Sequence, residues 1–94
     1  MTIYFDENFL INLAKIQDFI ANDSINRAIK FKDDLYQKIS EIYPFPLRFR
    51  KNLLVNKDNV RDLIFKGYVV PFEINDNHIM ILTIYKNNLW KPNK

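Results

Sequence analysis

The feature that most constrains the fold is a run of three β-prone segments within residues 60–86. They are rich in β-branched and aromatic residues, and turn-forming residues divide them. The first break contains Gly67, the only glycine of the chain, where we expect a positive φ. The second is Asn75-Asp76-Asn77, whose side chains bond their own main chain and tolerate a left-handed backbone. The pattern predicts a meander of two consecutive hairpins.

Pro71 interrupts the second of these segments. A proline has no N–H to donate to the ladder of a sheet. We therefore expect either a β-bulge at Pro71 or an outward-facing position without a ladder hydrogen bond.

The upstream half predicts one short strand and two helices. Residues 2–5 are too few to be stable alone and should join the sheet. Apolar residues then recur at spacings of three and four, which predicts helices over residues 7–21 and 25–42, with Asp6 and Ser24 as N-caps. The short connection makes the helices antiparallel neighbours. The predicted buried stripes are Phe9, Leu13, Ile16 and Ile20 in the first helix, and Ala28, Phe31, Leu35, Ile39 and Ile42 in the second.

Tyr43-Pro44-Phe45-Pro46 ends the second helix, because proline cannot continue it. Residues 47–59 then read as a polar, basic loop. The element order is β-α-α-β-β-β, which defines the α+β class. We expect a single domain over residues 1–94, in which a helical hairpin packs on a mainly antiparallel four-stranded sheet.

Composition excludes several classes of protein. The 94 residues are 48% hydrophobic, enough for one folded domain, and contain no cysteine for a disulfide or a thiolate metal site. The N-terminus has no signal-peptide pattern, and no apolar run approaches the length of a membrane span. We expect a cytoplasmic protein without membrane contact.

Positive charge concentrates in the C-terminal half. The net charge of the chain is +3, but residues 1–47 carry five basic and seven acidic groups, against nine and four in residues 48–94. This asymmetry favours an anionic partner, either nucleic acid or an acidic protein segment, over a merely solvated surface. Aromatic residues interleave with the basic ones, and Trp90 reads equally as a packing anchor or a binding residue. The basic cluster is Arg48, Arg50, Lys51, Lys57, Arg61, Lys66 and Lys86.

No enzyme signature is present in the sequence. A phosphate-cradling loop needs several glycines, and no His or Cys spacing suits a metal. The sole histidine, His78, reads as a surface residue beside a turn, and Ser24 and Ser40 read as a cap and a helix-surface residue. Asp33-Asp34 reads as the solvated face of the second helix. We expect neither a metal nor a cofactor.

The chain resembles the RelE/ParE superfamily of bacterial toxins from type II toxin–antitoxin systems. The matching pieces, in order, are the short first strand, the helical hairpin with its acid-rich second helix, and the proline stretch 43–46. The run from Val60 to Phe72 and the closing run from Ile81 to Trp90 also match. The resemblance covers nearly the whole chain.

The resemblance implies one of two activities. RelE-like members cut messenger RNA in the ribosomal A site, whereas ParE-like members inhibit DNA gyrase. RelE-like nucleases usually carry an arginine three residues before the Gly-Tyr pair, where this chain has Ile64. They also carry a basic cluster after the last strand, where this chain has Lys86 followed by two asparagines. These departures favour a ParE-like toxin. A ribonuclease would instead draw its catalytic residues from Arg61, Tyr85 and Lys86.

The resemblance also implies a partner, a small and often acidic antitoxin that wraps the toxin and covers its basic surface. Its expected roles are growth inhibition and plasmid stabilisation. A third alternative is an inactive homologue that only binds an antitoxin. The residues expected to bind a target or nucleic acid are Arg48, Arg50, Lys51, Arg61, Lys66, Lys86 and Trp90.

Overall fold

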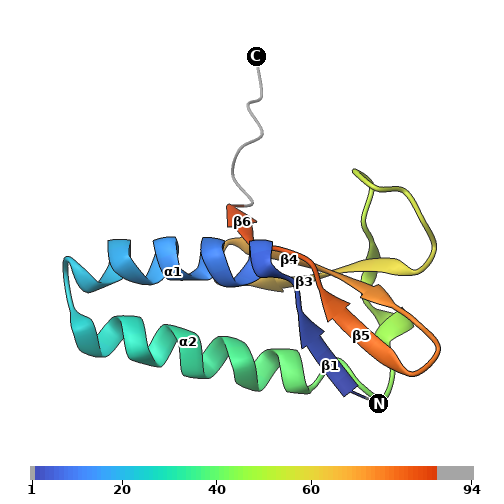
Figure 1. Ribbon diagram of the computed structural model, residues 1–94, viewed down its shortest axis with the longest axis horizontal. Coiled ribbons are helices and arrows are strands. Elements are labelled where there is room, and N and C mark those ends of the chain that lie inside the picture. The colour runs from blue at the N-terminus through green and yellow to red at the C-terminus, as the bar shows by residue number, and fades with distance from the viewer. Residues whose placement is uncertain (1, 87–94) are drawn as a thin grey trace.

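The computed structural model describes residues 2–86 and contains two long helices and a six-stranded sheet (Figure 1). Trp90 therefore lies outside the described residues. The elements in chain order are β1 (Thr2–Phe5), α1 (Glu7–Ala21), α2 (Ile25–Ser40), a 3₁₀ turn (Pro46–Arg48), β2 (Arg50–Lys51), β3 (Val60–Phe65), β4 (Tyr68–Ile74), β5 (His78–Ile81) and β6 (Tyr85–Lys86).

Both helices begin at the predicted side-chain caps. The carboxylate of Asp6 accepts a hydrogen bond from the backbone N–H of Asn8 at 2.8 Å, and the hydroxyl of Ser24 accepts one from the N–H of Arg27 at 3.1 Å. Each bond satisfies a donor that the first turn of a helix leaves free. The predicted bounds of α1 and the predicted start of α2 are therefore confirmed.

The end of α2 was predicted too late. The helix ends at Ser40, whereas the apolar spacing had extended it to Ile42. The N–H groups of Glu41 and Ile42 donate to carbonyls three residues earlier, at 3.1 Å each. This is the tighter pattern of a 3₁₀ turn, which commonly closes a helix and still directs Ile42 into the core.

The sheet is mixed and has the strand order β1-β5-β4-β3-β2, with β6 also paired to β4. Its four main strands are the ones predicted from the sequence. β2 has two residues and lies inside the segment predicted as a loop. The third predicted run, residues 78–86, is interrupted at residues 82–84, so that its end forms the separate two-residue strand β6. The α+β class is confirmed. β1 runs parallel to β5, and all other pairs are antiparallel.

The turn between β3 and β4 explains the position of the glycine. Phe65 pairs with Tyr68, which leaves a two-residue turn in which Lys66 and Gly67 have φ angles of +48° and +84°. Two positive φ angles are typical of the type I′ turn, whose twist matches that of a hairpin. Across residues 2–86 the only other positive φ is at Asn56, so the turn at residues 75–77 forms without a left-handed residue.

Pro71 faces an interruption of the sheet, in agreement with the expected bulge. On one side it stays in register with Asp62 of β3. On the other side, Phe72 pairs with Ile81 and Val69 with Tyr85. Residues 82–84 therefore lie opposite residues 70–71 of β4, and the segment between β5 and β6 contains one extra residue. The ring of Pro71 is buried rather than turned outward, and its carbonyl accepts a hydrogen bond from the N–H of Leu82 at 2.9 Å.

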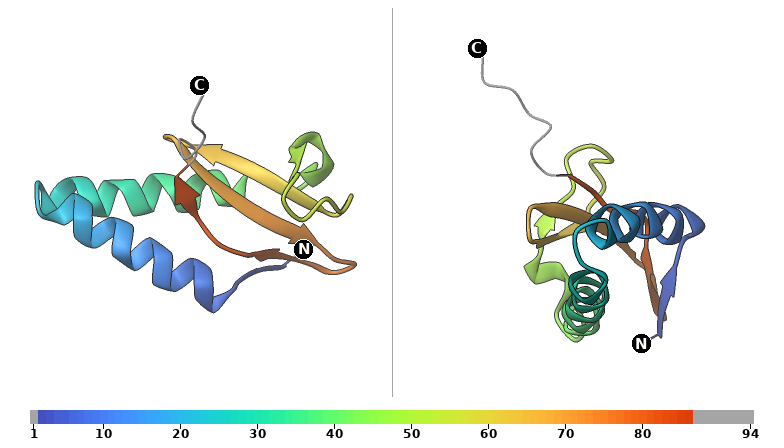
Figure 2. Two further views of the ribbon diagram at one scale, coloured as in Figure 1. Left: turned by 90° about the horizontal axis from the view of Figure 1, so that it is seen from above. Right: turned by 90° about the vertical axis from the view of Figure 1, so that its left-hand side faces the viewer.

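The helical hairpin covers one face of the sheet and extends past its end (Figures 1 and 2). The predicted stripe of α2 is buried in full, and all of it except Ala28 belongs to a core cluster with side chains from β3, β4 and β5. Phe9 and Leu13 of α1 are also buried, whereas Ile16 and Ile20 are only partly covered. The hairpin turn lies beyond the sheet, which explains why burial decreases along α1.

Candidate functional site

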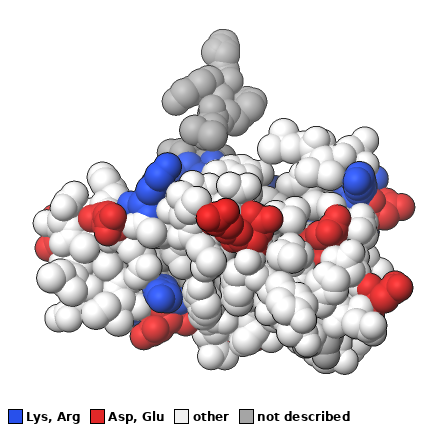
Figure 3. All heavy atoms as spheres, viewed as in Figure 1, with Lys and Arg blue, Asp and Glu red and all other residues white. Residues whose placement is uncertain are grey.

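The seven basic side chains of the cluster differ in their surroundings. Figure 3 shows that basic and acidic side chains are interspersed on the face it presents, rather than separated into one positive surface. The role of these residues in binding a target stays a prediction. Their individual contacts divide them into structural residues and accessible ones.

Arg48 holds the end of α2. Its guanidinium donates to the carbonyl oxygens of Glu41, Ile42 and Phe45 at 2.9, 3.2 and 3.1 Å. The last carbonyls of a helix lack partners within the helix, and a guanidinium can bind several of them at once. The same group lies over the ring of Phe49, 4.3 Å from its centroid. Arg48 thus closes the junction between helix and loop.

Arg61 fixes the segment that precedes β3. It donates to the backbone carbonyls of Asp58, Leu47 and Phe49 at 2.8, 3.3 and 3.1 Å. Leu47 belongs to the 3₁₀ turn, and Phe49 and Asp58 belong to irregular chain on either side of β2. The described contacts of Arg61 therefore hold the chain before β2 against the chain that leads into β3.

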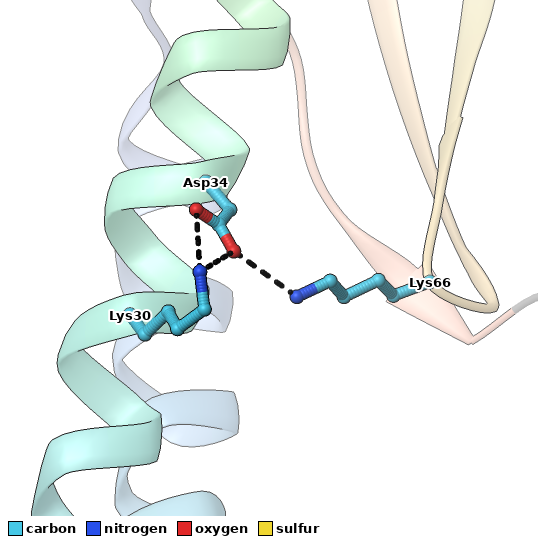
Figure 4. Close-up of polar contacts among 3 residues, drawn as sticks. All are labelled: Lys30, Asp34 and Lys66. Atoms are coloured by element: carbon cyan, nitrogen blue, oxygen red, sulfur yellow. Dashed lines mark hydrogen bonds and ion pairs between the residues drawn. The ribbon is translucent and has the colours of Figure 1, made fainter.

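Lys66 joins the β3–β4 turn to α2 (Figure 4). Its Nζ lies 3.3 Å from a carboxylate oxygen of Asp34, and Lys30 approaches the same oxygen at 3.0 Å. Hydrogen bonds from Lys30 and then Lys66 lower the pKa of the Asp34 carboxyl. The acid-rich face of α2 therefore neutralises one of the predicted binding residues.

Arg50 and Lys51 of β2 lie beside a buried carboxylate. The Nε of Arg50 is 3.0 Å from Asp62, which is 4% exposed, while Arg50 itself is 56% exposed. The amide of Asn52 donates to the other oxygen of Asp62 at 2.7 Å. Lys51 pairs with the exposed Asp58 at 3.2 Å. A hollow of about 150 Å³ is lined by Arg50, Lys51, Asn52, Leu53, Leu54, Asp62 and Tyr85.

Tyr85 lies beside this group on the sheet face turned away from α2. Burial raises the pKa of the Tyr85 phenol, and the charge of Asp62 raises it further, against smaller opposing effects of Asn52 and Arg50. Both effects move the phenol further from ionisation at neutral pH.

The three candidate catalytic residues are not brought together. Successive strand residues point to opposite faces, and paired residues share a face. Arg61 pairs with Phe72 and Lys86 with Tyr68, so both point to the core side but at opposite ends of β4. Tyr85 pairs with Val69 and points to the other side. Lys86 lies over the ring of Tyr68, 5.1 Å from its centroid.

The sequence reasoning missed a groove along α1. It has a volume of about 440 Å³, and α1 and the chain from Ile84 to Lys86 form its two walls. Asn12 donates to the hydroxyl of Thr83 at 2.9 Å and separates this groove from a neighbouring hollow of about 380 Å³. Residues lining the groove are Asn12, Lys15, Ile16, Phe19, Tyr68, Ile84, Tyr85 and Lys86.

A signal for this groove is present in the sequence of α1. The helix is apolar on more than one side, because Leu10, Ile11 and Phe19 accompany the buried stripe, and Phe19 is the member of this set that lines the groove. These three side chains are 48%, 47% and 74% exposed. A helix that is apolar beyond one stripe usually has a second covered surface. The four-three spacing identified the core side and left this excess unexplained.

Other kinds of site find no support within residues 2–86. No three His, Asp or Glu side chains in this range are grouped so that they could hold a metal ion. None of the helices described there is long and apolar enough to cross a membrane. His78 packs edge-on against Tyr4, with ring centroids 5.3 Å apart, as a surface residue would.

The fold defines a class of small α+β proteins in which a long helical hairpin covers one face of a mixed sheet. The family model for the ParE toxin of the type II toxin–antitoxin system parDE matches residues 3–88. The chain belongs to this ParE toxin family, in agreement with the resemblance seen in the sequence.

Solved structures include one with a similar fold. It is titled as the chromosomal ParDE TA system from P. aeruginosa, and it superposes with a TM-score of 0.74 at 18% sequence identity. The match covers 92% of this chain and 95% of the other. The search among curated proteins gave no match.

Proposed function

We propose that this ParE-family toxin acts in the cytoplasm by binding a macromolecular target such as DNA gyrase, and that a cognate antitoxin neutralises it. The observation that carries a binding mechanism is the separation of Arg61 from Tyr85 and Lys86, which both line the groove along α1. A ribonuclease has to hold its catalytic groups around one phosphate. Here Arg61 is engaged by backbone carbonyls, and Tyr85 points to the opposite face from Lys86.

The state of Tyr85 also favours binding over RNA cleavage. A tyrosine with its ordinary pKa of 10.0 is already protonated at neutral pH, and burial raises the pKa of Tyr85 further from that range. A catalytic base needs a pKa near the working pH. The phenol of Tyr85 is therefore poorly suited to activate a ribose hydroxyl.

An assay of DNA supercoiling tests the proposed target. Purified protein is added to gyrase, relaxed plasmid and ATP, and we expect the appearance of supercoiled plasmid to fall as toxin is added. Unchanged supercoiling at stoichiometric excess would exclude gyrase. Mapping of messenger RNA ends on translating ribosomes runs in parallel. New toxin-dependent ends that Arg61→Ala and Lys86→Ala together abolish would establish the interferase alternative.

The groove along α1 is our proposed binding place for the antitoxin. It is mostly apolar, and Lys15 and Lys86 lie among its lining residues. These features suit an amphipathic segment whose polar side is acidic. Phe19 is 74% exposed there and offers a large apolar contact.

Co-expression with a small acidic protein encoded beside this chain tests that proposal. We expect the acidic protein to restore growth to cells that make the wild-type toxin. Phe19→Ser should weaken the rescue, whereas Ile25→Ser, which is 68% exposed but outside the groove, should not. Equal rescue of both variants would contradict the proposed docking place. Normal growth with the toxin alone would favour the inactive homologue.

A further inference from the structure

Three consecutive apolar side chains project into solvent between β2 and β3. Leu53, Leu54 and Val55 are 80%, 81% and 46% exposed, and we call these residues the apolar loop. In Figure 1 this segment extends away from the sheet, on the side opposite the turn between α1 and α2. Grouped exposed aliphatic side chains are uncommon on a monomer surface and mark interaction sites.

The apolar loop is built as a fixed turn around Asn52, which is 2% exposed. The backbone N–H of Asn52 donates to the carbonyl of Val60 at 2.9 Å, and its own carbonyl accepts from Asn56 at 2.8 Å. The side chain of Asn52 donates to Asp62 at 2.7 Å and accepts from the N–H of Val55 at 2.8 Å.

Every polar group of Asn52 thus holds the turn, and Asn56 closes it with a φ of +60°. A binding loop that is already ordered loses less conformational freedom when it binds. The packing of the protein itself does not need the two leucines, because four-fifths of each side chain is in solvent. The hydrogen bonds therefore hold the backbone on both sides of two leucines that are mostly exposed.

The charges around the apolar loop define the chemistry of its partner. Arg50 pairs with the buried Asp62 and Lys51 pairs with Asp58, so Lys57 supplies the net positive charge beside the apolar loop. A partner surface with an apolar pocket edged by carboxylates would complement both features. A second copy of this chain does not fit this description at the α1 groove, because Lys15 and Lys86 would repel the loop.

A protein surface fits better than an anionic membrane. The hollow of about 380 Å³ beside the loop, lined in part by Leu54 and Val55, can receive a protruding side chain. A knob beside a hollow matches a shaped protein surface rather than a fluid one.

We propose that the apolar loop is the anchor by which the toxin binds its protein target, with Leu53 and Leu54 inserted into an apolar pocket edged by acidic side chains. The inference rests on the proposed function, namely that growth inhibition follows from binding a protein. It adds the binding element and the kind of surface that receives it.

The test compares growth arrest by wild type, Leu53→Ser/Leu54→Ser and Ile25→Ser/Ile29→Ser at matched protein levels. The control pair is also exposed, at 68% and 53%, but lies at the start of α2. We expect the leucine variant to lose at least about tenfold in growth inhibition, as removal of a hot spot does, with thermal unfolding unchanged. The isoleucine control should keep full inhibition. Arrest by the leucine variant as strong as that by wild type would overturn the inference.

Two further arms separate the alternatives. Lys57→Glu should weaken growth arrest, and the control Lys32→Glu in α2 should not. Equally strong arrest by the two variants would contradict acidic side chains at the edge of the target pocket. Co-sedimentation with vesicles of phosphatidylethanolamine and phosphatidylglycerol, dependent on Leu53 and Leu54, would assign the loop to membranes instead. If arrest depends on the leucines but purified gyrase is unaffected by wild type, only gyrase is excluded. If wild type and Leu53→Ser/Leu54→Ser inhibit gyrase equally, gyrase is the target but the apolar loop is not the anchor.

Discussion

The amide of Asn52 and the carboxylate of Asp62 meet at 2.7 Å in a place where the two residues are 2% and 4% exposed. Hydrogen bonds to an ionised oxygen are shorter and stronger than neutral ones. This bond joins the turn after β2 to the centre of β3. The apolar loop follows Asn52 directly, and Asn52 and Asp62 both line the hollow of about 150 Å³ near Tyr85, so this bond supports both features.

Asn52→Ala should destabilise the fold by about 2–3 kcal/mol, because it removes a bond to a charged group and leaves a buried carboxylate partly unpaired. Urea unfolding measures the loss as a lower midpoint. Asn26→Ala, an exposed position on α2, provides the control and should change the midpoint little. Equal midpoints for the two variants would show that the buried bond contributes no net stability.

Arg48→Lys should cost about 1–2 kcal/mol, because an ammonium cannot bind three diverging carbonyls as the guanidinium does. The variant keeps the charge, so a role in attracting an anionic partner would be retained. Thermal unfolding distinguishes the two roles. Lys57→Ala serves as the control, and we expect it to melt with wild type. An unchanged melting temperature for Arg48→Lys would contradict the capping role.

Gly67→Ala should cost about 1–2 kcal/mol, because an L-residue is strained at a φ of +84°. No neighbouring atom lies within 4 Å of the place that a Cβ at this position would occupy, so a steric clash would not account for the loss. Gly67→Asn should cost less, since asparagine tolerates a left-handed backbone. Denaturant titration of both variants checks the order. Alanine as stable as asparagine would contradict the proposed cause.

The lowered pKa of Asp34 predicts a dependence of stability on acid. A carboxyl that binds protons less readily when folded adds stability above its unfolded pKa of 3.8. That stability is lost as the pH falls through the lower folded pKa. Lys66→Ala should raise the pKa of Asp34 toward 3.8. Carbon NMR of the Asp34 carboxyl as a function of pH measures this change. Lys38→Ala, which pairs with Glu41 instead, should leave that titration unchanged.

The raised pKa of Tyr85 predicts that the stability of the fold decreases with rising pH in the alkaline range, whereas Asp34 makes it increase with pH in the acid range. Its phenol keeps its proton in the folded state after the unfolded chain has lost it, at the ordinary tyrosine pKa of 10.0. Stability should therefore fall as the pH rises above 10 toward the folded pKa. The difference in ultraviolet titration between wild type and Tyr85→Phe isolates this group. A Tyr85 transition at or below 10 would contradict the effect of burial.

Most of the fold could be predicted because local signals and tertiary packing agree. Rules that act within a few residues predict the bounds of α1, the cap at Ser24 and the positive φ at Gly67. The pairing of β1 with β5 is different, because no local pattern states the direction of a strand in a sheet. The two-residue strand β2 is too short for periodicity to reveal, and no local signal marks the interruption between β5 and β6 within the third predicted run.

The candidate site was harder to predict than the fold. Composition counted Arg48 and Arg61 as available positive charges, but their guanidinium groups bind backbone carbonyls that only the folded chain brings near. In the same way, Asp62 appeared as one acid inside a basic half, although its burial organises Arg50 and Asn52. Sequence gives the charge of a residue and not its partner.

The parallel pairing of β1 with β5 also determines when this protein can be completed. Thr2 has its strand partner at His78, so the earliest residues of the sheet wait for nearly the whole chain to be synthesised. Pairs so distant in sequence form late in folding. A translation product cut short before His78 leaves β1 without a neighbour, and such an open edge makes unfinished chains prone to aggregate.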